Sequence, residues 1–139
     1  GVTRDQRVLL CLTDTRDFPT VFLGAIRAGV IPVPLNTLLT PDDFGWILCN
    51  SGAVAVFVSG DLADKWTDIA ANQPYVRFIS SDGGPWADLE ALIEGANPMT
   101  EPADTHRDDV AFWLYTSGST GRPKGAMHAQ SSMRLTANL

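Results

Sequence analysis

Residues 7–35 read RVLLCLTDTRDFPTVFLGAIRAGVIPVPL, and this stretch decides the fold class. It opens with a continuous apolar run over residues 7–13, which is typical of a strand buried on both faces of a parallel sheet. Apolar residues at helical spacing follow over residues 18–29. We expect Asp17 to cap this helix and Gly29 to end it.

Two further signals define the elements that come next. Residues 31–35 are extended, but Pro32 and Pro34 have no N–H group to donate to a sheet ladder. We therefore place this segment at a sheet edge or in an extended connection. Thr40 and Pro41 predict a helix start, because threonine caps a helix and proline fits its first position.

Strands and helices continue to alternate along the chain. The remaining expected elements are strands over residues 53–58, 76–80 and 110–115, a helix after Asp61, a short helix from Trp86 to Ile93, and a surface linker over residues 96–109. This order is the signature of an α/β fold, with alternating strands and helices that form a layered, largely parallel sheet.

The composition bounds the class of protein. The chain has 139 residues, 45% of them hydrophobic, which suits one folded domain and excludes intrinsic disorder. Its 10 basic and 16 acidic side chains give a net charge of −6. This balance argues against a general nucleic-acid binder or a protein bound to anionic membranes. No apolar run approaches the roughly 20 residues of a membrane-spanning helix, and nothing in the sequence indicates an oligomeric state.

Two cysteines, Cys11 and Cys49, each lie alone in an apolar segment. They form no C-x-x-C motif, so no zinc site is expected. We interpret them as two buried thiols in a reducing compartment. With no signal peptide visible, we expect a cytoplasmic protein. Both ends look cut, because the helix expected over residues 131–139 has no stop signal, and we expect a fragment of a longer protein.

One stretch stands apart from this framework: residues 115–125 read YTSGSTGRPKG. It follows an expected strand and is expected to precede a helix. Its glycines let the backbone approach a ligand closely and adopt positive φ, and successive N–H groups can form a concave anion nest. Hydroxyls add donors, and Lys124 adds a compact positive charge. The stretch therefore predicts a polyphosphate-binding loop in an otherwise acidic chain.

The loop differs from two common phosphate-binding patterns. After Gly118 and four intervening residues, a Walker A loop requires Gly-Lys-Ser/Thr, where this chain has Pro123, and the G-x-G-x-x-G pattern is also absent. The alternative interpretation is a flexible surface loop with incidental glycine and serine. Such a linker rarely follows a strong apolar strand and rarely ends in Pro-Lys-Gly, so we favour the phosphate loop.

The order of residues 116–125, TSGSTG, one variable position and PKG, resembles the signature of the adenylate-forming superfamily. This superfamily comprises acyl- and aryl-CoA synthetases, luciferases and the adenylation domains of peptide synthetases. Residues 22–36 resemble the helix-and-strand segment that precedes the loop in these enzymes. Residues 36–44 and 112–115 are most similar to the benzoate-CoA ligase branch. The resemblance implies that residues 1–139 are a fragment of the large N-terminal AMP-binding domain, without the rest of that domain and the small C-terminal domain.

The same resemblance implies an ATP-dependent carboxylate–CoA ligase, most similar to benzoate-CoA ligase. In the family, a carboxylate attacks the α-phosphate of ATP in the presence of Mg²⁺, an acyl-adenylate forms and pyrophosphate leaves. The thiol of CoA then converts the adenylate into a thioester. The implied partners are ATP, CoA and an aromatic small-molecule carboxylate. The loop would hold the β- and γ-phosphates and stabilise the charge that grows on the leaving group.

The resemblance also assigns roles within the loop. Lys124 would be the catalytic residue that neutralises the leaving pyrophosphate. Arg122 occupies the variable position and receives no specific role, and no metal-ligating residue is expected. The nucleotide would be bound by backbone N–H groups, hydroxyls and the lysine of Thr116, Ser117, Gly118, Ser119, Thr120, Gly121, Lys124 and Gly125.

Other residues that could carry chemistry are interpreted as structural. His128 is expected to be a partly exposed residue at the start of a helix, and core packing is expected for Trp46, Trp66, Trp86 and Trp113. The family's later ribose-binding aspartate and C-terminal catalytic lysine are missing, so the chain alone is expected to be inactive. Two other functions stay open: a non-catalytic or degenerate adenylation-fold binding module, and an amino-acid-adenylating domain.

Overall fold

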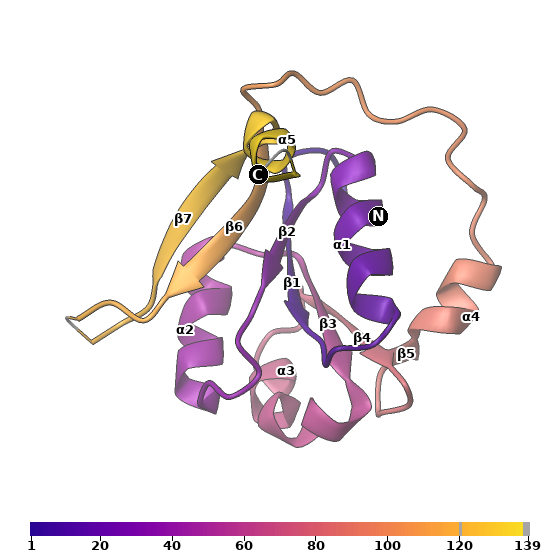
Figure 1. Ribbon diagram of the computed structural model, residues 1–139. Coiled ribbons are helices and arrows are strands. Elements are labelled where there is room, and N and C mark those ends of the chain that lie inside the picture. Colours follow the sequence, from indigo (N-terminus) through magenta and orange to yellow (C-terminus); the bar gives the residue numbers. More distant parts are fainter. Residues whose placement is uncertain (120, 138–139) are drawn as a thin grey trace.

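The computed structural model describes residues 1–119 and 121–137, and Figure 1 shows a sheet with helices on both sides. Five parallel strands form this sheet in the order β2-β1-β3-β4-β5. The strands are β1 (Arg7–Cys11), β2 (Ile31–Pro34), β3 (Ala55–Ser59), β4 (Arg77–Ser81) and β5 (Ala87–Asp88). The expected α/β fold is confirmed, and so is the edge position of the proline-containing strand.

Helices bury both faces of the sheet. They are α1 (Asp17–Arg27), α2 (Pro41–Ser51), the 3₁₀ helix η1 (Gly60–Lys65), α3 (Thr67–Ala71) and α4 (Leu89–Glu94). Leu9 and Cys11 of β1 belong to the core cluster under α2 and η1, whereas Val8 and Leu10 belong to the cluster under α1 and α4. Burial on both faces explains why β1 is continuously apolar. None of the helices in the described part of the chain has the length and apolar composition needed to cross a bilayer.

The starts of α1 and α2 differ in how they are capped. α2 begins with a capping box: Asp43 N–H donates to Thr40 Oγ1 at 3.2 Å, and Thr40 N–H donates to Asp43 Oδ2 at 3.4 Å. This start is as predicted. The expectation that Asp17 caps α1 is wrong, because Arg16 is the N-cap and makes no side-chain cap bond. Asp17 lies inside the first turn, and its carboxylate accepts a hydrogen bond from Ser81 Oγ at 2.5 Å.

Two predicted helices are shorter than expected. The helix predicted after Asp61 is divided into η1 and α3 at Trp66, whose side chain is fully buried in the core. The helix predicted from Trp86 begins only at Leu89, because the intervening residues pair with β4 as the short strand β5. α1 ends as predicted near Gly29, which follows the C-cap residue Ala28 and adopts a φ of +72°.

β6 (Val110–Thr116) and β7 (Lys124–Ala129) form a separate antiparallel hairpin, which α5 (Gln130–Ala137) follows. The expectation that the phosphate loop leads directly into a helix is therefore wrong. β6 lies beside the edge strand β2, but Pro32 and Pro34 offer no N–H groups for a ladder there. Since backbone groups of a partly buried strand need partners, β6 pairs with β7 instead.

The four tryptophans contribute to the core, as predicted. Trp66 is fully buried, and its ring stacks on that of Phe44 with a centroid distance of 4.7 Å. The other three tryptophans are partly buried and pack against the same cluster. Core packing therefore accounts for all four tryptophans without a ligand.

The two cysteines differ in exposure. Cys11 is buried in β1, whereas Cys49 is exposed in the last turn of α2. The expectation of two buried thiols is wrong for Cys49, because Ile47 and Leu48 occupy the buried side of that helix. Burial also raises the pKa of the Cys11 thiol from 9.0 to about 11.

We expect alkylation to distinguish these two thiols. In the folded protein at pH 8, iodoacetamide should modify Cys49 and leave Cys11 intact, because only thiolates react and Cys11 is both buried and protonated. Peptide mass spectrometry before and after denaturation measures the labelling of each site. Rapid modification of Cys11 without denaturant would contradict its placement in the core.

Candidate functional site

The candidate phosphate loop connects β6 and β7 at the free end of their hairpin, on the left of Figure 1. Antiparallel pairing places Tyr115 opposite Gly125 and Thr116 opposite Lys124. The two ends of the loop therefore lie side by side, and Lys124 lies opposite Thr116, where the loop begins. Thr120, which was predicted to bind phosphate, lies outside the described residues.

The predicted phosphate-binding side chains are accessible. Thr116, Ser117, Ser119 and Lys124 are exposed, and Gly118 is half-buried. Their hydroxyl and ammonium groups can thus meet a ligand without displacing core residues. The hairpin brings all of these residues into one short turn, although they come from the end of one strand and the start of the next.

Lys124 is oriented by contact with the loop itself. A Cβ atom placed on Gly118 would lie 3.8 Å from both Cδ and Cε of Lys124, so the aliphatic stem runs along the Gly118 backbone. Pro123 is buried and restricts the backbone just before the lysine. The stem is therefore directed along the loop, while the charged end remains in solvent.

Glycine suits two positions of the loop, 121 and 125, for different structural reasons. Gly121 adopts a φ of +105°, a conformation that other residues rarely adopt. At Gly125, a Cβ atom would lie 3.2 Å from Cζ of Tyr115, so the Tyr115 ring covers this backbone and leaves little room for a side chain. Gly125 therefore serves packing within the hairpin, whatever its part in binding.

Residues at the end of α2 and the start of β1 support the hairpin. Arg7 Nε donates to the Ser51 carbonyl at 2.7 Å, and its guanidinium lies 5.6 Å from the Trp113 ring centroid. Tyr115 Oη donates to Asn50 Oδ1 at 2.7 Å. The sequence did not indicate Arg7 or Asn50 as part of the site, because only the tertiary fold brings them to β6.

His128 does not belong to the phosphate loop. It lies in β7 rather than at a helix start, which corrects the sequence-based expectation. Its imidazole is half-buried and stacks on Phe112, with ring centroids 4.6 Å apart and an interplanar angle of 3°. Phe112 and His128 are paired several residues away from the Thr116–Lys124 pair that closes the loop. A packing role accounts for the histidine.

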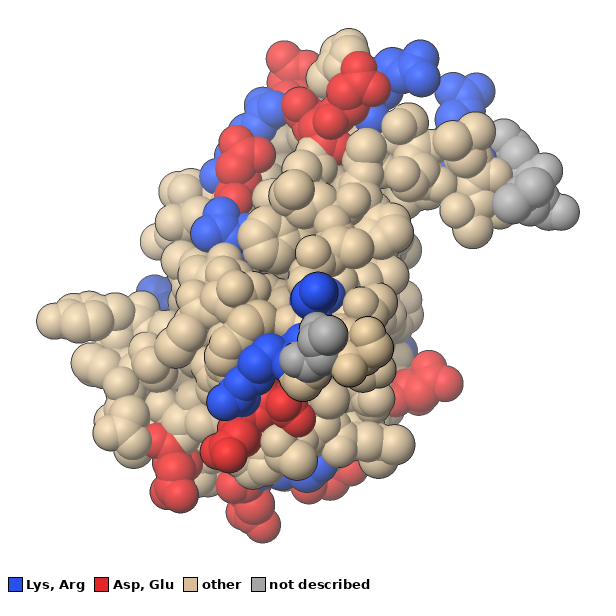
Figure 2. All heavy atoms as spheres, turned by 90° about the vertical axis from the view of Figure 1, so that its left-hand side faces the viewer, with Lys and Arg blue, Asp and Glu red and all other residues tan. Residues whose placement is uncertain are grey.

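The charge distribution favours an anion at the hairpin rather than elsewhere. Residues 110–139 carry three basic side chains and no acidic one, whereas the rest of the chain has seven basic and sixteen acidic side chains. Figure 2 views the molecule from the side on which the hairpin projects, and basic atoms lie near the middle of this face. The loop thus offers local positive charge in a chain whose net charge is negative.

Local contacts cross the position at which an open parallel sheet usually binds a nucleotide. Such sites lie beyond the carboxyl ends of the strands where the strand order reverses, here between β1 and β3. Thr13 N–H donates to Ser59 Oγ at 2.9 Å, and the two hydroxyl oxygens lie 3.1 Å apart. A Cβ atom on the adjacent Gly60 would lie 2.6 Å from the Gly83 carbonyl oxygen. These contacts occupy part of the edge between β1 and β3.

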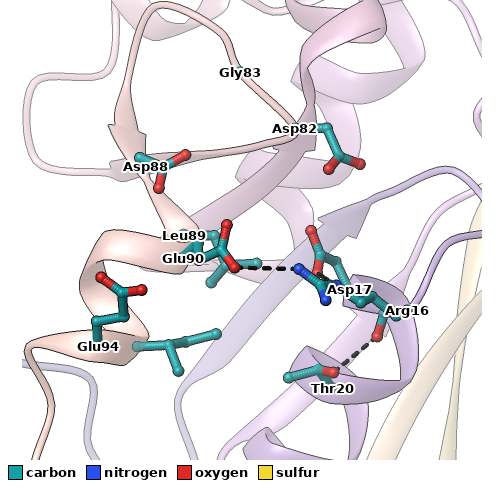
Figure 3. A pocket seen from close by; sticks show the side chains of 10 residues that line it. Arg16, Asp17, Thr20, Asp82, Gly83, Asp88, Leu89, Glu90 and Glu94 are labelled. Atoms are coloured by element: carbon teal, nitrogen blue, oxygen red, sulfur yellow. Dashed lines mark hydrogen bonds and ion pairs between the residues drawn. The ribbon is translucent and has the colours of Figure 1, made fainter.

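A cavity of about 450 Å³ lies near this edge, between α1, α4 and the turn after β4 (Figure 3). Its single basic side chain, Arg16, is already paired with Glu90 at 3.2 Å. Its acidic lining residues are Asp17, Asp82, Asp88, Glu90 and Glu94. Such a lining repels polyphosphate, so the hairpin loop remains the candidate site.

The chain combines a parallel α/β sheet with a basic, hydroxyl-rich glycine loop on an adjoining hairpin. The chain belongs to the AMP-binding enzyme family, whose family model matches residues 1–139. The sequence-based resemblance to the adenylate-forming enzymes is thereby confirmed.

The chain is similar to aryl-CoA ligases along its whole length. It is 42% identical to a benzoate–CoA ligase of Thauera aromatica, over 100% of this chain and 27% of that protein. It is 43% identical to a 4-hydroxybenzoate–CoA/benzoate–CoA ligase of Rhodopseudomonas palustris, over 99% of this chain and 26% of that protein. The solved structure of a benzoate CoA ligase from Burkholderia xenovorans LB400 matches with a TM-score of 0.89 and 41% identity, over 100% of this chain and 27% of that one. The chain therefore spans about a quarter of the length of the curated relatives that it matches.

Proposed function

We propose that this chain is part of an ATP-dependent carboxylate–CoA ligase that acts on an aromatic acid, as benzoate–CoA ligases do. In this proposal, residues 1–139 are a portion of the large N-terminal AMP-binding domain of a longer enzyme, called the full-length protein below. The observation that carries the proposal is the 42% identity to a benzoate–CoA ligase across the whole chain, the loop included. The solved benzoate CoA ligase with a TM-score of 0.89 supports it.

The proposed reaction has two steps. A carboxylate oxygen attacks the α-phosphorus of ATP, the bond to the β-phosphate oxygen breaks, and pyrophosphate leaves. The thiol of CoA then loses its proton as its sulfur attacks the acyl carbon, and AMP leaves with the thioester as product. In the first step the enzyme must hold the phosphates in line and stabilise the negative charge that grows on the leaving group.

The hairpin loop is proposed to perform this task. N–H groups from Gly118 to Gly121 and the hydroxyls of Thr116, Ser117, Ser119 and Thr120 would donate hydrogen bonds to the β- and γ-phosphates. Lys124 would place its ammonium group against the leaving pyrophosphate. The exposure of the described loop residues and the local positive charge support this assignment.

Mg²⁺, when bound with ATP, would neutralise phosphate charge. Among residues 1–119 and 121–137, no three His, Cys, Asp or Glu side chains are grouped in a way that could hold a metal ion. The proposed location of the full-length protein is the cytoplasm, because ATP and CoA are available there.

The test is a substrate panel with the full-length protein. ATP–pyrophosphate exchange should be stimulated most by benzoate and its hydroxylated forms, less by a long-chain fatty acid, and not by phenylalanine. With CoA added, the aryl-CoA thioester and AMP should appear in equal amounts by liquid chromatography. Omitting the acid or the ATP provides the controls.

The other outcomes would identify the alternatives. Exchange stimulated only by amino acids would indicate an amino-acid-adenylating enzyme. Absence of exchange with every acid, from a folded protein that still binds ATP, would indicate a binding module. Either result would overturn the proposed ligase.

A further inference from the structure

Tyr115 connects the base of the phosphate loop to α2. It is the next-to-last residue of β6, immediately before Thr116. Its hydroxyl donates to Asn50 Oδ1 at 2.7 Å, in the last turn of α2. Its ring packs edge-on against Trp46 of the same helix, with a centroid distance of 6.3 Å and an interplanar angle of 89°. Two contacts thus hold one side chain against one helix.

The same ring also holds the far end of the loop. Tyr115 is paired across the hairpin with Gly125, and a Cβ atom at Gly125 would lie 3.2 Å from Tyr115 Cζ and 3.4 Å from its Oη. The adjacent cross-strand pair is Thr116 and Lys124. A shift of the Tyr115 ring would therefore move both ends of the loop relative to α2.

The hydroxyl stays a hydrogen-bond donor throughout the physiological pH range. Burial raises the pKa of Tyr115 above its usual value of 10.0, and the nearby positive charge of Arg7 opposes this only in part. The α2 end is itself fixed, because the Ser51 carbonyl accepts a hydrogen bond from Arg7 Nε at 2.7 Å. The acceptor Asn50 therefore lies on a held segment, and the bond can transmit its position to the loop.

We infer that Tyr115 is a positioning residue for the phosphate loop, and that its hydrogen bond to Asn50 sets the orientation in which the loop meets the β- and γ-phosphates. The inference rests on the proposed function. In this proposal both residues act indirectly on the nucleotide. Tyr115 acts through the backbone of Thr116 and Gly125, and Asn50 acts through Tyr115.

The experiment compares three variants of the full-length protein: Tyr115→Phe, Asn50→Ala and the double variant. In ATP–pyrophosphate exchange, each should raise the KM for ATP and for pyrophosphate about two- to tenfold, the factor expected for one net hydrogen bond. The KM for benzoate should not change. A loss of folded enzyme would lower kcat and leave each KM unchanged, so the KM values separate positioning from stability. The double variant should be no worse than either single variant, because both remove the same bond.

Tyr75→Phe is the matched control. Tyr75 is the only other tyrosine in the sequence, and 96% of its side chain is exposed. The same loss of a hydroxyl there should leave every KM at the wild-type value. Hydrogen exchange followed by mass spectrometry adds a second measurement: exchange in the loop peptide should be faster in Tyr115→Phe and Asn50→Ala, and unchanged in Tyr75→Phe.

The outcomes distinguish the two proposals. If the wild-type protein is active and Tyr115→Phe has wild-type KM values, or if the effects of the two substitutions add, the positioning role is overturned and the ligase assignment stands. If the wild-type protein shows no exchange with any carboxylate, the proposed function itself fails, and the role of Tyr115 in phosphate positioning fails with it.

Discussion

Replacing Lys124 with alanine in the full-length protein is expected to slow adenylate formation by about one to three orders of magnitude, the scale seen when one transition-state donor is lost. Negative charge grows on pyrophosphate as its bond to the α-phosphorus breaks, and an ammonium group on a flexible stem can follow that charge. The Lys124 side chain is exposed, and its stem lies against the backbone of Gly118. Its removal should therefore affect the reaction rather than the fold.

Pyrophosphate exchange at saturating ATP and benzoate measures this effect. Lys124→Arg keeps the positive charge but replaces the compact ammonium group with a planar guanidinium group, and it should retain more activity than Lys124→Ala. Arg122→Ala is the matched control, because Arg122 is another exposed cation of the loop and occupies its variable position. It should leave the rate near the wild-type value. A wild-type exchange rate in Lys124→Ala would remove this lysine from the mechanism.

Replacing Trp66 with alanine is expected to destabilise the fold by about 3–5 kcal/mol, the usual cost of removing a large aromatic side chain from a core. Trp66 is fully buried between the sheet and α2. Its ring stacks on Phe44 at 4.7 Å and contacts Phe78 at 6.0 Å between centroids. Alanine would leave a cavity that these rings can fill only in part. A loss of this size is a large fraction of the stability of an ordinary domain.

Urea denaturation of the full-length protein, followed by circular dichroism, checks this expectation. Trp66→Phe keeps part of the stacking surface and should lose less stability than Trp66→Ala. Tyr75→Ala removes an aromatic ring that is 96% exposed, and it should change stability by no more than about 0.5 kcal/mol. Equal losses from Trp66→Ala and Tyr75→Ala would contradict the burial of Trp66 in the core.

Most strands and helix ends of the parallel sheet could be predicted because their signals are local. The apolar run before Thr13 needs burial on both faces wherever it lies, and Thr40 caps α2 through a residue only three positions away. Asp17 shows where such reasoning fails. Its position suits an N-cap. Its carboxylate instead accepts a hydrogen bond from the hydroxyl of Ser81, which is distant in sequence.

The residue types of the candidate site could be predicted, but the secondary structure that carries them and the residues that surround them could not. Glycines, hydroxyls and Lys124 within one short stretch indicate phosphate binding from sequence alone. The hairpin that presents them was missed, because the residues of β7 have no clear alternation and pair only when β6 lies beside them. The contacts of Asn50 and Arg7 with β6 were missed because only the tertiary fold brings these residues together.

The sequence by itself determined the alternating α/β order, a sheet edge or extended connection for β2, the capped start of α2 and the position of the candidate phosphate loop. Each depends on backbone chemistry or on side-chain spacing within a few residues. Only the tertiary structure decided that the loop lies on an antiparallel hairpin, that Tyr115 rests on α2, and that Thr13 bonds to Ser59 at the carboxyl edge between β1 and β3. The Thr13–Ser59 and Tyr115–Asn50 hydrogen bonds join residues 46 and 65 positions apart, and the hairpin forms only where β6 and β7 pair with each other, so these partners exist only once the chain has folded.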